Sequence, residues 1–368
     1  MLLYLSDCII EKIDRAGLSN DEQWSLNVIA DCVRRGYHLV SGNRPVFDKL
    51  AALDGMDAKV SEIFRSLGNR SAQFRNIFQS MSVYVNVCIN EGDYSFEEVD
   101  GVTRINVPLG LFAIREYAQP SILLMEHYND MRIYSGVLDW YRSKYFGGGF
   151  SYNFERCNGN GGNTCHVFEN LQSNNRRLTL CVTDSDKWSP DDGLGGTAKD
   201  VNDINNPSIA VVEHLMLEVR ELENLIPLSV LKVVKARSRS NGIADELLSA
   251  FEQLIDEGRQ DSLLYWDYKK GVICKKITKS EAVLGFWDDI YSIAKSNFRR
   301  SCSRDVCVDG SCDKAIFPSW PLQSETSTYI EAESISYDDV TDRYLYPILD
   351  QLGRVLFSWG VTSGQRST

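Results

Sequence analysis

Two aspartates separated by one residue follow an apolar run in the middle of the chain. The run reads Leu178-Thr-Leu-Cys-Val-Thr-Asp184-Ser-Asp186. If it forms a strand, Asp184 and Asp186 project to the same side, because side chains at i and i+2 share a face. Two adjacent carboxylates repel each other, and a shared divalent cation neutralises both. A single acid at this place would more often cap a helix or close a turn. It is the pair that predicts a metal site.

Two further acidic motifs lie on either side of this pair. A strand of the buried type, Pro120-Ser-Ile-Leu-Leu-Met125, ends in Glu126, and Asp130 follows shortly after it. Downstream, Arg220-Glu221-Leu-Glu223 is expected on a helix or at its end. Strands that alternate with helices predict a mainly parallel sheet, whose strands present their carboxyl ends to one side. Ligands of such sheets bind at that edge, so we expect Glu126 and the aspartate pair to share a crevice.

The pattern of apolar residues divides the chain into three segments. Residues 1–80 alternate short strands with amphipathic helices and predict a small α/β module. Residues 81–228 hold leading strands and then the strands that carry the acids, with a helix expected to begin near Glu213. Residues 229–368 are expected to be mostly helical, with a hairpin over residues 264–273 and a cysteine loop. Pro347 either kinks the last helix or marks its start. The expected fold class is α/β with a central, mainly parallel sheet.

Composition excludes several classes of protein. The chain of 368 residues is 43% hydrophobic and carries a net charge of −12. This charge argues against capture of nucleic acid by the whole surface, but not against a nuclease whose acids gather metal ions. Ten cysteines in a chain of this length do not indicate a disulfide scaffold. The first residues lack the features of a signal peptide, and no stretch is apolar for long enough to predict a membrane span. We therefore expect a cytoplasmic protein.

The order of the acidic motifs carries a resemblance to a known family. Residues 118–230 resemble a Toprim domain, in the version found in OLD-family and other anti-phage defence nucleases. Ile122-Leu-Leu-Met-Glu126-His-Tyr-Asn-Asp130 is similar to the first motif of that family, and Leu180-Cys-Val-Thr-Asp184-Ser-Asp186 to the second. Arg220-Glu221-Leu-Glu223-Asn224 is similar to an acidic motif seen after the aspartate pair in defence-associated members. The chain departs from the family at His127, where glycine is usual, and in a longer glycine-rich insertion at 147–163.

The resemblance implies a reaction and a role for each acid. It implies a nuclease that hydrolyses phosphodiester bonds of DNA or RNA with Mg²⁺ or Mn²⁺, which oxygen ligands suit. Glu126 is then a ligand or the general base, and Glu223 either a ligand or a helix acid paired with Arg220. The resemblance also implies a partner protein from a defence system, such as an ATPase. The implicated residues are Glu126, Asp184 and Asp186 in catalysis, with Asp130 and Glu223 as further ligands, and Lys187 and Lys199 as candidate substrate contacts.

Other classes of function stay open from the sequence. The first is an adaptor or sensor that keeps the fold without catalysis and binds a partner protein or nucleic acid. The second is nucleotidyl transfer, or hydrolysis of a small ligand, in the same crevice. Metal binding distinguishes the first from a nuclease, and a screen with nucleotides identifies the second.

Three weaker signals lie outside the acidic motifs. Asp7 follows the first strand as in PIN-like nuclease domains, but the further acids that such a site requires (Glu22, Asp31 or others) form no convincing set, and a helix cap explains Asp7 equally well. The glycine-rich Asn158-Gly-Asn-Gly-Gly-Asn163 lacks a phosphate-loop pattern and is expected to form a turn at the rim of the crevice. A structural Zn²⁺ site is a further candidate, on the clustered thiols of Cys302, Cys307 and Cys312.

Overall fold

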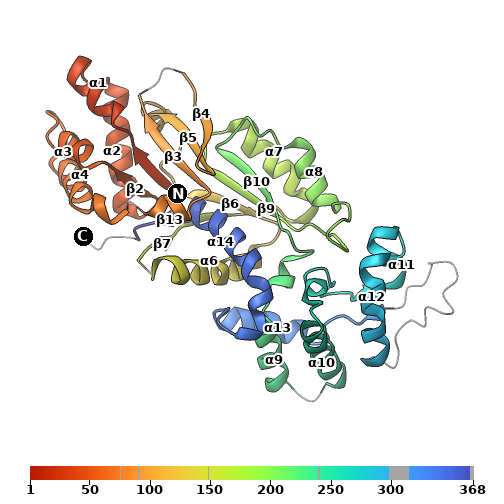
Figure 1. Cartoon of the computed structure of the whole chain (residues 1–368). Coiled ribbons are helices and arrows are strands. Elements are labelled where there is room, and N and C mark those ends of the chain that lie inside the picture. The colour runs from red at the N-terminus through yellow and green to blue at the C-terminus, as the bar shows by residue number, and fades with distance from the viewer. Residues whose placement is uncertain (75, 90–91, 148, 239–240, 298–314, 365–368) are drawn as a thin grey trace.

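The computed structural model describes residues 1–74, 76–89, 92–147, 149–238, 241–297 and 315–364. It confirms the α/β class: two main sheets lie side by side, and a group of helices lies below the second one (Figure 1). Among the described residues, no helix has both the length and the apolar composition that crossing a lipid bilayer requires.

The first sheet has five strands in the order β2-β1-β3-β5-β4. All pair in parallel except β4, which runs antiparallel to β5. The sequence pattern places residues 81–108 in the second segment, but β3 pairs with β1 and so belongs to the first sheet. The strands are β1 (Leu2–Leu5), β2 (Leu39–Gly42), β3 (Val83–Cys88), β4 (Ser95–Val99) and β5 (Val102–Pro108). The helices are α1 (Cys8–Ala16), α2 (Asn20–Arg35), α3 (Arg44–Ala51), α4 (Ala58–Arg70) and α5 (Leu111–Ile114).

The second sheet has four parallel strands in the order β10-β9-β6-β8. The prediction that a helix begins near Glu213 is wrong, because residues 212–216 form a strand that pairs along its whole length with β9. For so short a segment, pairing with a neighbour decides the structure and local pattern does not. The strands are β6 (Ser121–Met125), β8 (Phe154–Asn158), β9 (Thr179–Thr183) and β10 (Val212–Met216), connected by α6 (Met131–Phe146), α7 (Thr164–Asn174) and α8 (Gly196–Ile204).

The strand order of the second sheet creates a crevice at one place. From β6 the chain moves outward to β8, then returns past β6 to β9 and continues to β10. The direction of winding therefore reverses between β6 and β9. In open parallel sheets, such a reversal leaves a crevice outside the carboxyl ends of the two strands, and ligands bind there. Glu126 follows β6 directly and Asp184 follows β9 directly.

The C-terminal segment is mostly helical, as predicted. The hairpin expected over residues 264–273 is wrong: β11 (Val272–Ile273) pairs with the distant β12 (Ala315–Phe317), and Asp267 caps the turn before it. Pro347 lies in the first turn of α14 and marks the start of that helix. The helices are α9 (Leu228–Arg237), α10 (Gly242–Asp256), α11 (Cys274–Ile277), α12 (Glu281–Asn297), α13 (Gln323–Ala332) and α14 (Tyr346–Gly360).

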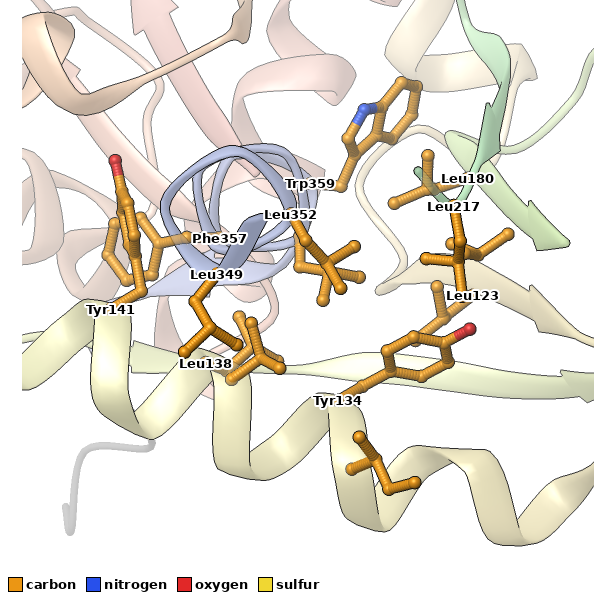
Figure 2. Close-up of a cluster of buried hydrophobic side chains, with 14 of the residues drawn as sticks. Leu123, Tyr134, Leu138, Tyr141, Leu180, Leu217, Leu349, Leu352, Phe357 and Trp359 are labelled. Carbon is orange, nitrogen blue, oxygen red and sulfur yellow. The ribbon is translucent and has the colours of Figure 1, made fainter. Parts of the chain in front are cut away.

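Helix α14 returns from the helical segment to the sheets and packs against α6. Figure 2 shows its Leu349 and Phe357 facing Leu138 and Tyr141 of α6. The chain then forms β13 (Val361–Thr362), which pairs with β7 (Ser151–Tyr152). This packing fixes α6, and α6 begins immediately after the turn that contains Asp130.

Candidate active site

Glu126 and Asp184 lie together at the point where the winding of the sheet reverses. The backbone N–H of Asp184 donates to Oε1 of Glu126 at 3.1 Å, and Oδ1 of Asp184 accepts from the N–H of Leu222 at 2.9 Å. Oε2 of Glu126 and Oδ2 of Asp184 accept no hydrogen bond from the residues that the structure describes. Each carboxylate thus has one oxygen held by the backbone and one available to a ligand.

Asp186 is positioned by a turn and not by the strand. Strand β9 ends at Thr183, and Asp186 has a left-handed backbone with φ 55°. The expectation that Asp184 and Asp186 share a face of one strand is therefore wrong. The turn is held by Arg220, whose carbonyl accepts from the N–H of Asp186 at 2.8 Å and whose guanidinium donates to the carbonyl of Asp186 at 2.9 Å. Asp186 nevertheless faces Glu126 closely enough for its charge to raise the pKa of that carboxyl.

The motif Arg220–Asn224 lies beside the aspartate turn, where a 3-10 turn at Leu222–Leu225 follows Glu221. The suggested pairing of Glu223 with Arg220 is wrong. Glu223 instead contacts the ammonium of Lys269 at 2.9 Å, while Arg220 forms a buried ion pair with Asp267 at 3.0 Å. Glu223 thus faces the same crevice as Asp184, whose pKa it helps to raise.

Lys269 is a site residue that reasoning from sequence did not find. Its ammonium lies 2.9 Å from Glu223 and 3.8 Å from Glu221. Lys269 is far from these acids in the sequence. It lies in a stretch with several lysines, a pattern that is typical of a solvated surface. Only the turn capped by Asp267, which lies in the helical segment, carries it to the sheet. No local signal could have shown this contact.

Burial and mutual repulsion raise the pKa values of the acids. Burial raises the pKa of Asp184 well above its usual range, and Glu126 adds to the shift. Burial also raises the pKa of Glu126, that of Asp130 to about 6 and that of Glu221 to about 7. Carboxylates that are desolvated and repel each other are stabilised by protonation or by a bound metal ion, because either one neutralises their negative charge.

Asp130 follows Glu126 in a short turn. Its carboxylate accepts from the backbone N–H of His127 at 2.8 Å. His127 stands where the similar family has glycine, but its φ of −137° is ordinary for any residue and its side chain is exposed. The turn beside Glu126 therefore accommodates a histidine without crowding.

The candidate ligands are of the chemical type that binds a hard divalent cation, but they are not arranged tightly around a single point. All the candidate donors are carboxylate oxygens, which Mg²⁺ and Mn²⁺ prefer. The charge of Glu126 helps to raise the pKa of the buried Asp184, so the two carboxylates lie close together. In the part of the chain that the structure describes, no three His, Cys, Asp or Glu side chains are grouped tightly enough to hold a metal ion. The zinc candidates Cys302, Cys307 and Cys312 lie outside the described residues.

The two candidate substrate lysines do not contact the acids. Nζ of Lys187 donates to the carbonyl of Pro190 at 3.2 Å. Lys199 is exposed on the first turn of α8, and no interaction joins it to the acids in the described structure. Both roles stay predictions.

The glycine-rich loop forms a turn beside Glu126, as expected. The N–H of Gly159 donates to the carbonyl of Met125 at 2.7 Å, and that of Gly161 to the carbonyl of Glu126 at 3.2 Å. The loop therefore uses these amides to hold the end of β6 and not to bind a phosphate.

Asp7, the candidate acid of the first sheet, accepts from the Asn43 side chain at 2.7 Å. It precedes α1 without a side-chain capping bond. Of the further acids considered with it, Glu22 belongs to the capping box of α2 and Asp31 pairs with Arg34 and Arg35. These contacts supply no acidic partner to Asp7.

Gly195 offers a direct test of the position of Asp186. A Cβ atom at Gly195 would lie 2.3 Å from Cβ of Asp186 and 2.4 Å from its Oδ2, whereas one at Gly196 would meet nothing within 4 Å. We expect Gly195→Ala to displace Asp186 and to weaken Mn²⁺ binding about tenfold, measured by calorimetry. Gly196→Ala is the matched control and is expected to bind like the wild type. Equal binding by both variants would show that Asp186 does not contribute.

The raised pKa values predict how metal and pH act together on stability. The folded chain keeps protons on Asp130 and Glu221 that the unfolded chain releases near pH 4. The metal-free protein therefore loses this contribution as pH rises from about 4 to about 6 to 7, at about 1.4 kcal/mol per unit of pKa shift. A cation bound at Glu126 and Asp184 stabilises the ionised forms of the neighbouring acids, so Mg²⁺ should raise the melting temperature more at pH 8 than at pH 5. Equal shifts at the two pH values in differential scanning fluorimetry would contradict this coupling.

Comparisons of this chain with models of protein families, with curated proteins and with solved structures find no match.

Proposed function

We propose that this chain is a metal-dependent nuclease that hydrolyses phosphodiester bonds in nucleic acid. The observation that supports this most is the meeting of Glu126 and Asp184 at the reversal point of a parallel sheet. Each has an oxygen left for a ligand, and a third acid, Asp186, is held beside them by a clamped turn. Convergent carboxylates with perturbed pKa values in a crevice are the usual sign of a functional site.

The residues of the candidate site have distinct roles in the proposed reaction. Glu126 and Asp184 would hold the cation, with Asp186 as a further ligand supplied by the turn. When bound, Mg²⁺ or Mn²⁺ polarises a phosphoryl oxygen and lowers the pKa of bound water. Asp130, with a pKa of about 6, can accept or release a proton near neutral pH. Lys269 offsets part of the negative charge at Glu221 and Glu223, so that an anionic substrate can approach.

The Toprim assignment and the role in defence belong to the same proposal. Four parallel strands that carry a strand-terminal Glu, a later aspartate pair and a third acidic motif are consistent with a Toprim-like unit. Anti-phage defence and an ATPase partner follow from the sequence resemblance alone. The contacts of Asp7 lend no support to a PIN-like active site in the first sheet.

The runner-up is a non-catalytic adaptor or sensor with the same fold. The ion pair between Lys269 and Glu223 favours it, because a lysine already neutralises one candidate ligand. Calorimetry with Mn²⁺ separates the two proposals, since an adaptor that has lost the site would bind no metal.

The experiment for the proposed function uses the full chain. Single-stranded and duplex DNA and RNA are incubated with Mg²⁺, with Mn²⁺ or with EDTA, and nucleoside triphosphates are tested in parallel. We expect polymer cleavage with either metal and none with EDTA. Absence of Mn²⁺ binding together with absence of cleavage would overturn the proposal. Turnover of nucleotides alone would replace it with small-ligand chemistry.

A further inference from the structure

A cavity opens directly from the acidic cluster toward the helical segment. It shares Asp130, Glu223 and Lys269 with the cluster. Its other walls come from the start of α6, from the turn after Glu221 and from one face of α13. Arg132 of α6 donates to the carbonyls of Ile330 and Glu331, so that α13 is fastened across the opening. The cavity and the candidate active site thus form one continuous surface made by two parts of the chain.

The lining of this cavity is apolar at its floor and polar at its rim. Ile133, Leu222 and Ile226 are buried at the floor, together with the ring of Tyr268. At the rim, Gln323 donates through Nε2 to the carbonyl of Lys269 at 3.1 Å, which leaves its Oε1 as an acceptor. The Tyr268 hydroxyl is buried, and Thr326 lies close enough to it to act on its pKa. A flat group with apolar faces and a polar edge would satisfy both kinds of surface.

Charge and size decide what such a group is. Three of the lining residues are acidic (Asp130, Glu223 and Glu331) and two are basic (Arg132 and Lys269), and the remaining excess of negative charge disfavours a phosphate within the cavity. The volume is about 140 Å³, which is below the roughly 300 Å³ at which pockets for drug-sized ligands begin. It admits one group and no paired strand. A nucleobase is such a group: it is neutral and flat, and enzymes bind unpaired bases by stacking and by contacts to the polar edge.

We propose that this cavity holds the unpaired base next to the bond that is cut, so that the substrate is single-stranded or has a base turned out of the helix. The inference rests on the proposed nuclease function. The scissile phosphate would lie at the acids and Lys269, while the neighbouring base inserts between α6 and α13. A continuous duplex would have to open before a base could enter.

Two neighbouring positions of α13 provide a matched test. Ser327 lines this cavity, whereas Thr328 lies on another face of the helix. Both are exposed, and each side chain donates to a carbonyl one turn back, at 3.0 Å and 2.9 Å. A tryptophan at either place therefore costs the same local bond, but only Ser327→Trp fills the cavity. Asn129→Ala, which removes an exposed amide at the rim, is a second variant that leaves the core untouched.

Binding is measured by fluorescence anisotropy with Ca²⁺, using single-stranded DNA and RNA and blunt duplexes of the same sequences. We expect the wild type to bind single strands at least tenfold more tightly than duplexes. Ser327→Trp should weaken single-strand binding about tenfold or more, Asn129→Ala about fivefold, and Thr328→Trp less than twofold. Melting temperatures verify that the variants fold.

The outcomes separate this inference from the proposed function. Equal affinity of Ser327→Trp and Thr328→Trp, with Asn129→Ala like the wild type, would overturn the base-binding cavity. So would a wild type that prefers duplexes. Single-strand binding that depends on Ser327, without any Mn²⁺-dependent cleavage, would retain the cavity and reject the nuclease. A stronger loss with RNA than with DNA would identify the sugar that the cavity accepts.

Discussion

Replacing Asp184 with asparagine is expected to abolish Mn²⁺-dependent cleavage while raising the stability of the metal-free protein at pH 8. Asparagine keeps the oxygen that accepts from the N–H of Leu222 but removes the negative charge offered to a cation. Loss of a principal metal ligand should lower kcat/KM by at least about a thousandfold, or about 4 kcal/mol. The carboxyl is desolvated and its pKa lies well above the usual range, so ionising it at pH 8 without metal costs stability that an amide does not.

The control for this variant changes the same chemical group at an exposed place. Asp203 lies on the exposed side of α8, and Asp203→Asn should change neither cleavage nor melting temperature appreciably. The stabilisation by Asp184→Asn should become smaller as pH falls, because burial raises the pKa of the wild-type carboxyl and the carboxyl takes up its proton as pH falls. Cleavage by Asp184→Asn at a rate near that of the wild type, with Mn²⁺ still required, would reject Asp184 as a ligand.

The elements that sequence patterns could predict are those whose own residues determine them. Strand β6 consists of buried residues only, and a continuous apolar run of this length predicts a strand of a parallel sheet. Glu126 and Asp184 could be expected to meet because both follow such strands directly. Pro347 could be placed because proline is tolerated in the first turn of a helix.

The features that sequence patterns could not predict depend on distant contacts. Strand β10 forms because β9 offers a partner, and the half-buried side chains of Glu213 and His214 give no clear period of their own. Asp186 lies outside the strand because both the backbone carbonyl and the guanidinium of Arg220 form hydrogen bonds with its backbone. Lys269 reaches the acids only because Asp267, in the same turn, is anchored by Arg220. The candidate ligands were thus visible in the sequence, while the residues that position them were not.

Arg220 connects these distant contacts, and its removal is expected to have the largest effect on stability. Its guanidinium pairs with the buried Asp267 at 3.0 Å, donates to the carbonyls of Asp186 and Lys187 and lies 3.8 Å over the ring of Trp188. Arg220→Met leaves the Asp267 carboxylate buried and unpaired. Breaking a buried pair in this way costs about 3 to 5 kcal/mol. We expect a loss of that size in urea unfolding followed by tryptophan fluorescence.

Two further variants distinguish the buried pair from an ordinary surface contact. Arg237 pairs with Glu333 while both side chains are largely exposed, so Arg237→Met should cost far less stability than Arg220→Met. Adding Asp267→Asn to Arg220→Met removes the stranded charge but keeps an acceptor for the N–H groups of Lys269 and Lys270. The double variant should therefore recover part of the stability lost. Because the carbonyl of Asp186 stays without its partner, it should not recover Mn²⁺ affinity. Recovery of both would mean that Arg220 stabilises the fold without positioning Asp186, and a single variant as stable as Arg237→Met would contradict the role of the buried pair.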